Sequence, residues 1–311
     1  MNNPLVSIII PVYNLECHIG RCLDSVCNQS LRQIEVILVD DCSTDNSMSV
    51  VKKYSASDHR VKLISFDSNQ GPMIARQSGY LNAKGDYITF CDGDDVLPVQ
   101  AIEVLYQNAI SSKADIVCAN MTFISTTGNK RIMPNVLKYG TDSHSVYKSL
   151  LKGELVHSLC AKLFTRDILQ GYHYVNYPHF TNGEDGLLFY QIVANAKKII
   201  QIDESVYYYM QNVTSSSQKV FSELAVQNIV IANKNKELIC GNYPDLRNLL
   251  FITISKSLNS YIDKGYGTYV KKHLKEQDML DYISLTSMFS HYPLFDFVKT
   301  LIRRLFHSIL K

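Results

Sequence analysis

Continuous apolar runs alternate with segments of helical periodicity between residues 5 and 123. The apolar runs are rich in Val and Ile, and they predict buried strands at Leu5–Val12, Ile34–Val39, Val61–Phe66, Tyr87–Cys91 and Asp115–Phe123. Apolar residues at helical spacing predict the intervening helices at Leu15–Ser30, 45–56, 72–83 and 98–112. Strands that are apolar on both faces and separated by helices are typical of a mostly parallel sheet covered on both sides. The pattern therefore predicts an α/β fold.

The rhythm changes after residue 124. Ser125–Asn129 is a polar turn, the stretch up to about 215 mixes short strand and helix signals, and Ile199–Tyr209 is a second β-rich run. From residue 218 onward, helical patterns dominate. We therefore expect one sheet domain followed by a C-terminal helical extension, with the domain at 1–217, its halves at 1–123 and 124–217, and the extension at 218–311.

Composition narrows the function classes. The chain has 311 residues, of which 46% are apolar, and its net charge of +2 argues against a nucleic-acid partner. Its eight cysteines form no CxxC pair, so we expect free thiols in a reducing cytoplasm and no zinc site. The first residues carry no basic segment typical of a signal peptide, and no apolar run reaches the ~18 residues of a membrane span.

The most informative segment, residues 86–95, is DYITFCDGDD. An apolar run ends there in Asp92, Asp94 and Asp95, and we expect Gly93 to let the chain turn sharply. Three crowded carboxylates repel each other unless a cation or solvent neutralises them. Hard divalent cations take oxygen ligands, and ligands of α/β sheets bind at the carboxyl ends of strands. The alternative is an acidic surface turn that caps the following helix.

Polar residues also follow the first two strands, at the same predicted edge of the sheet. Tyr13 can stack on a base, and Asp41 can accept a hydrogen bond from a ring N–H. Asp45 is better placed to cap the helix that follows it. Arg76, in the first turns of its helix, is either a solvated surface residue or the partner of a phosphate or of Asp92.

Four segments resemble successive motifs of the family 2 glycosyltransferases with a GT-A fold, in that family's order: Val6–Asn14, Glu35–Ser47, Ala75–Gly79 and Gly85–Asp95. The resemblance implies that residues 1–123 bind a nucleotide-sugar, through Pro11, Tyr13, Asn14, Asp41, Arg76, Asp92, Gly93 and Asp94. Asp92 and Asp94 match the DXD motif, which implies Mn2+ or Mg2+ as a cofactor that bridges the diphosphate. The chain departs from the usual residues at Cys42 and Gln77, where Gly and Asn are commoner.

Glu184 and Asp185 precede a predicted apolar helix, Leu187–Ala194. In isolation, the two carboxylates fit the acidic first turn of a helix, stabilised by its dipole. The resemblance implies instead an ED motif whose Asp185 is the general base of an inverting reaction, with Glu184 as the alternative. It further implies that residues 124–217 form the acceptor half, and that Lys162 and Asp95 contact the acceptor.

The C-terminal segment 295–311 has pairs of apolar residues every four positions, with basic residues on the other face. This pattern fits a helix packed in the core, and it also fits an amphipathic helix on an anionic membrane. The sequence leaves both alternatives open.

Pattern and resemblance together predict a cytoplasmic enzyme, or one peripheral on the inner face of the plasma membrane. We expect it to transfer a hexose or N-acetylhexosamine from a nucleotide-diphosphate sugar, a UDP-sugar above all, to a hydroxyl of a glycan or lipid-linked acceptor in surface polysaccharide synthesis. A non-catalytic nucleotide-sugar- or glycan-binding homologue is an alternative, against which the intact acidic motifs argue. A sugar-1-phosphate nucleotidyltransferase would need a Gly-rich basic loop, which residues 11–20 lack.

Overall fold

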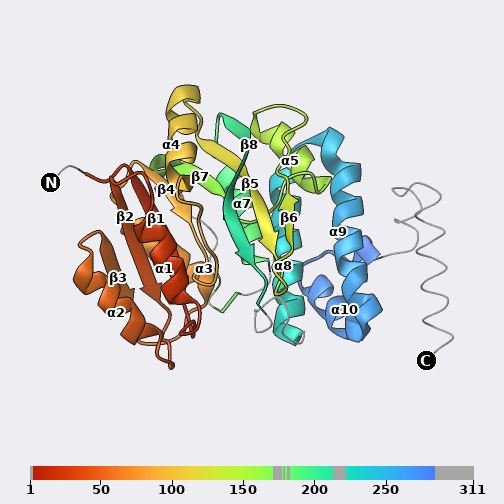
Figure 1. The fold of residues 1–311 in the computed structure, drawn as a ribbon. Helices are drawn as coiled ribbons and strands as arrows, with labels where there is room; N and C mark the ends of the chain where they lie inside the picture. Colours follow the sequence, from red (N-terminus) through yellow and green to blue (C-terminus); the bar gives the residue numbers. More distant parts are fainter. Residues whose placement is uncertain (1–2, 171–176, 178, 181–182, 213–221, 284–311) are drawn as a thin grey trace. The chain divides into compact units, whose positions relative to one another are not determined.

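The computed structural model describes residues 3–170, 177, 179–180, 183–212 and 222–283 (Figure 1). The predicted amphipathic segment 295–311 lies outside the described residues. Contacts divide the chain into two compact units, Met1–Lys219 and Val220–Lys311. The first unit contains the sheet, and the described part of the second consists of helices, so the predicted α/β fold with C-terminal helices is confirmed.

The described part of the first unit contains an eight-stranded sheet in the order β3-β2-β1-β4-β7-β5-β6, with β8 paired to β5. The strands are β1 (Val6–Val12), β2 (Ile34–Asp40), β3 (Val61–Ser65), β4 (Tyr87–Phe90), β5 (Ile116–Ile124), β6 (Lys130–Met133), β7 (Lys162–Thr165) and β8 (Ile199–Met210). Strands β1 to β4 pair in parallel, and β8 is parallel to β5. Antiparallel β7 lies between β4 and β5, so these two strands run in the same direction. The sheet is therefore mostly parallel, as predicted.

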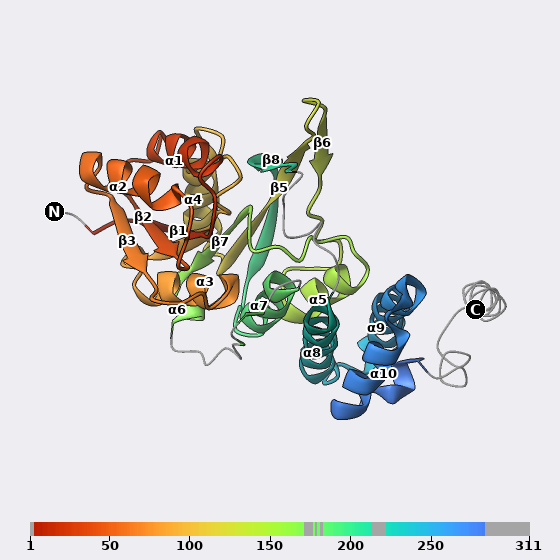
Figure 2. The same cartoon turned by 90° about the horizontal axis from the view of Figure 1, so that it is seen from below.

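Helices cover both faces of this sheet. The helices of the first unit are α1 (Ile19–Cys27), α2 (Ser47–Ser57), α3 (Pro72–Leu81), α4 (Ala101–Ser112), α5 (Ser143–Leu151), α6 (Arg166–Leu169) and α7 (Glu184–Val193). Figure 2 shows α1 and α4 on one face and α3 and α7 on the other. The apolar strands are buried on both faces because each face packs against helices; Ile8, Ile9 and Ile10 of β1 are all fully buried.

A glycine sets the distance between α3 and the sheet. A Cβ atom added to Gly79 would lie 2.3 Å from Cγ2 of Ile9 on β1, closer than real Cβ contacts allow. Only glycine therefore lets α3 approach the strand this closely. The same helix carries Arg76, so this close approach fixes the position of the arginine at the edge of the sheet.

The second unit is described up to residue 283. It contains α8 (Glu223–Cys240), α9 (Arg247–Tyr261) and α10 (Gly267–Glu276), with short turns of helix at Pro244–Leu246, Ile262–Tyr266 and Leu280–Ile283. Its interior includes apolar side chains such as Ile254, Leu258 and Leu274. Across the described residues, no helix combines the length and apolar character needed to span a bilayer.

Candidate active site

Three strands end at one edge of the sheet, and their following loops gather there. The pairing places Val12 of β1 beside Asp40 of β2, and Ile9 of β1 beside Phe90 of β4. The loops that begin at residues 13, 41 and 91 therefore leave the sheet on the same side. The N-terminus of α7 carries Glu184 and Asp185, which contact Arg76 of α3, a helix on the same face of the sheet (Figure 2).

Arg76 joins the two acidic motifs. Its side chain is buried, with the residue only 4% exposed, and its guanidinium lies 2.8 Å from Asp92, 3.1 Å from Asp185 and 3.4 Å from Glu184. Burial alone would lower the pKa of Arg76, but the three carboxylates outweigh it and raise the pKa well above the usual value. The arginine is therefore a permanent positive charge between segments that are distant in sequence. Its Nε atom is buried and has no hydrogen-bond partner among the described residues.

Asp185 has the properties of a base. Its Oδ1 is at ion-pair distance from Arg76, yet no donor among the described residues has hydrogen-bond geometry to this buried atom. Ser158 Oγ donates to the other oxygen at 3.4 Å. Burial raises the pKa of Asp185, opposed by Arg76 and reinforced by Glu184, to about 7. A carboxylate with a pKa near neutrality and one oxygen that accepts no hydrogen bond from the described residues is suited to accept a proton.

Asp92 and Asp94 belong to the same acidic segment, and Asp92 shares Arg76 with Asp185. Burial and the charge of Asp92 raise the pKa of Asp94, so the ionised form of Asp94 is destabilised unless a cation is near. Asn212 Nδ2 donates to Asp94 Oδ2 at 2.8 Å, which orients that carboxylate. Within the described residues, no three His, Cys, Asp or Glu side chains are arranged to hold a metal ion. Two carboxylates nevertheless fit Mg2+ or Mn2+, which take one or two protein carboxylates and complete their shell with water and substrate phosphates.

Asp95 and Lys162 lie inside the protein, at 1% and 0% exposure. Asp95 accepts hydrogen bonds from Tyr207 Oη and from the Met210 backbone, both at 2.7 Å, and burial beside Asp92 and Asp94 raises its pKa to about 8. Lys162 Nζ donates to the Ser158 carbonyl at 2.6 Å, and burial lowers its pKa. Their contacts here are structural, and the acceptor contacts expected of them stay predictions.

In the half predicted to bind a nucleotide-sugar, Asp41 anchors the turn that begins α3. Its two oxygens accept hydrogen bonds from the backbone N–H groups of Gln70 (2.6 Å) and Gly71 (2.9 Å). Burial outweighs these donors and raises the pKa of Asp41. Gly71 has φ +89°, and a Cβ there would lie 3.0 Å from the backbone of His179, so the turn requires glycine. Whether Asp41 also accepts from a base stays a prediction.

The loops after β1 and β2 are joined by side chains. Asn14 lies in the left-handed region, with φ +53°, and its Oδ1 accepts from the Thr44 backbone at 2.8 Å. Asp45 Oδ1 accepts from the backbone N–H of Ser47, the first residue of α2, at 2.9 Å, but the N-cap of this helix is Asn46, so Asp45 acts from one position before the cap. These contacts hold the loop between Pro11 and Asn14 in place and leave the ring of Tyr13 exposed.

Gly93 serves a different purpose from the one expected. Its backbone is not in the left-handed region, so the turn does not need the conformational freedom of glycine. A Cβ at this position would instead lie 2.7 Å from Leu15 and 3.3 Å from the Pro11 carbonyl. Gly93 is required because the segment packs tightly against the loop after β1.

Sequence reasoning missed three residues of the site: Ser158, Tyr207 and Asn212. The signal for Tyr207 was a run of three tyrosines with strand periodicity, which does not indicate which ring meets a carboxylate. Asn212 follows the same strand, and only its pairing beside the acidic segment identifies it. Ser158 lies in a loop and has no sequence signal of its own.

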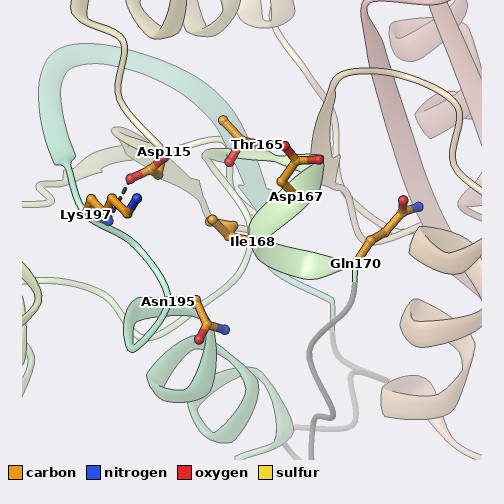
Figure 3. A pocket seen from close by; sticks show the side chains of 7 residues that line it. All are labelled: Asp115, Thr165, Asp167, Ile168, Gln170, Asn195 and Lys197. Atoms are coloured by element: carbon orange, nitrogen blue, oxygen red, sulfur yellow. Dashed lines mark hydrogen bonds between the residues drawn. The ribbon is translucent and has the colours of Figure 1, made fainter.

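A pocket of about 470 Å³ lies elsewhere (Figure 3). Its lining residues are Asp115, Thr165, Asp167, Ile168, Gln170, Asn195 and Lys197. Asp115 and Lys197 precede β5 and β8, and the Lys197 backbone N–H donates to Asp115 at 2.7 Å. The pocket is therefore at the opposite edge of the sheet and shares no residue with the acidic cluster.

The fold and the cluster place the chain among the α/β proteins that bind ligands at the carboxyl edge of a sheet. The chain belongs to the glycosyl transferase family 2, whose model matches residues 7–172. It is 33% identical over 246 residues to an uncharacterized glycosyltransferase of Haemophilus influenzae, covering 78% of this chain and 94% of that one. It is 29% identical to glycosyltransferase GlyA of Streptococcus pneumoniae, covering 77% of this chain and 35% of that protein.

Solved structures share the fold. S. aureus TarS 1–349 has a TM-score of 0.67 at 20% identity, over 91% of this chain and 80% of that one. The same protein in complex with UDP-GlcNAc has a TM-score of 0.65 at 18% identity, over 89% of each chain. The resemblance to a family 2 glycosyltransferase with a GT-A fold is thereby confirmed.

Proposed function

We propose that this chain is an inverting glycosyltransferase that moves a sugar from a UDP-sugar to a hydroxyl of a glycan or lipid-linked acceptor in surface polysaccharide synthesis. Family membership supports transfer from a nucleotide-sugar, and the similar fold of TarS is known with UDP-GlcNAc bound. A further relative, 31% identical over 66% of this chain and 32% of its own length, is a poly(ribitol-phosphate) beta-glucosyltransferase of Bacillus spizizenii, which supports a polysaccharide acceptor.

The observation that carries the proposal is the convergence of Asp92 and Asp185 on Arg76. One carboxylate belongs to the segment that would meet the diphosphate. The other has an oxygen that accepts no hydrogen bond from the described residues, and its pKa is about 7. The base that activates the acceptor and the group that neutralises the leaving diphosphate must lie at the same reacting carbon, so the segments that carry Asp185 and Asp92 have to meet. The buried, unpartnered Nε of Arg76 supplies a further donor for a diphosphate oxygen.

In the proposed reaction, Asp185 Oδ1 takes the proton of the acceptor hydroxyl while the oxygen of that hydroxyl attacks the anomeric carbon of the donor sugar. The bond from that carbon to the diphosphate oxygen breaks on the opposite face, so the configuration inverts. Asp94, with Asp92, would hold Mn2+ or Mg2+, which neutralises charge on the leaving diphosphate. Arg76 adds a fixed positive charge beside the same group and keeps Asp185 oriented.

The donor half would bind the nucleotide along the loops after β1 and β2. The exposed ring of Tyr13 is available to stack on the base, between Pro11 and Asn14. Asp41 is buried beneath these loops, where its carboxylate would accept a hydrogen bond from a ring N–H of the base in addition to those from the backbone of Gln70 and Gly71. Residues 124–217 would contribute the acceptor side, beginning at the Ser158 loop beside Asp185.

The test is a panel of nucleotide sugars, assayed for hydrolysis and transfer with and without Mn2+. We expect turnover with at least one UDP-sugar, and none without the metal. In calorimetry, Asp94→Asn should lose metal-dependent UDP binding while it keeps the wild-type melting temperature. Glu204→Gln, which neutralises an exposed carboxylate in the middle of β8, is the matched control and should bind like wild type. Unchanged affinity of Asp94→Asn for UDP and Mn2+ would show that the metal site is misassigned.

A further inference from the structure

The carboxyl end of β8 contacts the acidic segment residue by residue. The Tyr207 hydroxyl accepts a hydrogen bond from the Asp92 backbone N–H at 3.1 Å and lies 2.7 Å from Asp95 Oδ2. Since the N–H can only donate, the phenolic proton must point to the Asp95 carboxylate. One buried hydroxyl therefore fixes the first and the last carboxylate-bearing residue of the segment.

The next residues of the chain continue this series of contacts. The Met210 backbone N–H donates to the second oxygen of Asp95 at 2.7 Å. Asn212 Nδ2 donates to Asp94 Oδ2 at 2.8 Å. Backbone bonds between Val96 and Tyr208, at 3.2 and 2.9 Å, hold the strand and the segment side by side.

These contacts orient the Asp94 carboxylate in a way that favours binding of a cation. An amide donor on one oxygen of Asp94 holds the plane of the carboxylate and leaves the other oxygen for a ligand. Groups that hydrogen-bond to metal-ligating carboxylates orient them, and their loss commonly costs 10–100-fold in metal affinity or activity. Asn212 uses its Nδ2 and Tyr207 its hydroxyl proton to hold a carboxylate of this segment.

We propose that Tyr207 and Asn212 are positioning residues that set the affinity of the acidic segment for the divalent cation. This inference rests on the proposed function, because it assumes that Asp94 holds the metal. Asn212 would act on one ligand directly, and Tyr207 would act on the backbone that presents Asp92.

The experiment compares Asn212→Ala and Tyr207→Phe with two controls at neighbouring positions of the chain, Tyr208 on β8 and Gln211 just after it. Tyr208→Phe removes the hydroxyl of the neighbouring tyrosine, whose side chain points to the opposite face of the sheet. Gln211→Ala removes a side chain that accepts from the Thr126 backbone, away from the acidic segment. The probes are Mn2+ with UDP in calorimetry, and the Mn2+ dependence of turnover.

We expect Asn212→Ala to weaken Mn2+ binding in the presence of UDP by about 10–100-fold. UDP binding without metal and kcat at saturating Mn2+ should stay within about threefold of wild type, because the positioning acts through the metal. Tyr207→Phe should shift in the same direction. It leaves two buried groups unpaired, so its melting temperature is measured in parallel, and Asn212→Ala decides if Tyr207→Phe does not fold.

The inference is overturned if Asn212→Ala binds Mn2+ within twofold of wild type, or if the two controls lose as much affinity as it does. Both results can be told apart from a failure of the proposed function. If the proposed function is wrong, the wild-type protein itself will show no metal-dependent UDP binding and no turnover with any nucleotide sugar.

Discussion

Replacing Arg76 by methionine tests the central ion cluster. Methionine keeps an unbranched apolar stem and removes the charge, so Asp92, Glu184 and Asp185 lose their shared partner. Removing one member of a buried ion pair typically costs about 3–5 kcal/mol. The arginine side chain is 5% exposed, whereas the carboxylates keep 29%, 17% and 23% exposure. Because solvent still reaches the carboxylates, we expect the lower limit, a loss of about 3 kcal/mol in the free energy of unfolding.

The same change should alter the pH dependence of transfer. Arg76 opposes the effects that raise the pKa of Asp185 to about 7. Without this charge the pKa rises further, so a larger fraction of the base is protonated at neutral pH. Each unit of pKa corresponds to a tenfold change in that fraction on the acidic side. We therefore expect the acid limb of the pH–rate profile to move to higher pH, with a rate loss on the order of tenfold or more at neutrality.

Urea unfolding measures the stability, and initial rates over a range of pH measure the base. Arg76→Lys retains the charge but cannot reach three carboxylates, so its stability should lie between wild type and Arg76→Met. Adding Glu184→Gln to Arg76→Met removes one of the carboxylates left without a partner, so the double variant should regain about 1–2 kcal/mol in the free energy of unfolding. The reasoning is refuted if Arg76→Met unfolds at the wild-type urea concentration, or if its acid limb coincides with that of wild type.

Two further predictions concern carboxylates with shifted pKa values. Asp185→Asn should bind UDP normally and transfer about 10²–10⁴-fold more slowly. The pKa of Asp185 is raised from 3.8 to about 7, so its ionisation costs stability increasingly as pH rises through that window. Urea unfolding should therefore show the variant more stable than wild type above pH 7, by up to about 4 kcal/mol, with no gain near pH 4. Hydrogen bonds from Arg60 lower the pKa of Asp58 to about 2, so this ion pair stabilises the folded state above pH 4, and the stabilisation is lost as pH falls toward 2. Asp58→Asn should therefore lower the free energy of unfolding by about 2 kcal/mol at neutrality and by almost nothing at pH 2. The control Asp86→Asn changes an exposed carboxylate and should alter the free energy of unfolding little at either pH.

The sequence predicts the strands best where both faces are buried. The Ile34–Val39 prediction differs from β2 by one residue, because an uninterrupted apolar run has no other place in an α/β fold. Strand β7 was not predicted, since four residues that begin with Lys162 carry no periodicity. Its position between β4 and β5 depends on pairing over long sequence distances, which local patterns do not encode.

The site was predictable as a set of motifs but not as a set of contacts. The acidic character of Asp92 and Asp185 is visible in the sequence, and their resemblance to family motifs gives each an expected role. That Arg76 contacts both could not be predicted, because it depends on how closely α3 approaches β1 at Gly79. The tight packing around Gly93 was hidden for the same reason, since the atoms that exclude a Cβ come from another loop.

The charge of the cluster explains why a cation is the expected complement. Burial and crowding raise the pKa values of Asp95 to about 8 and of Asp185 to about 7, so these two carboxyls keep part of their protons near neutrality. Arg76 compensates about one of the remaining charges. The charge that one guanidinium cannot balance is then spread over Asp92, Asp94 and Glu184, at the edge where ligands of such sheets bind. A divalent cation bound there would relieve the repulsion that the fold itself leaves in place, so the groups that cost stability are the ones that the chemistry requires.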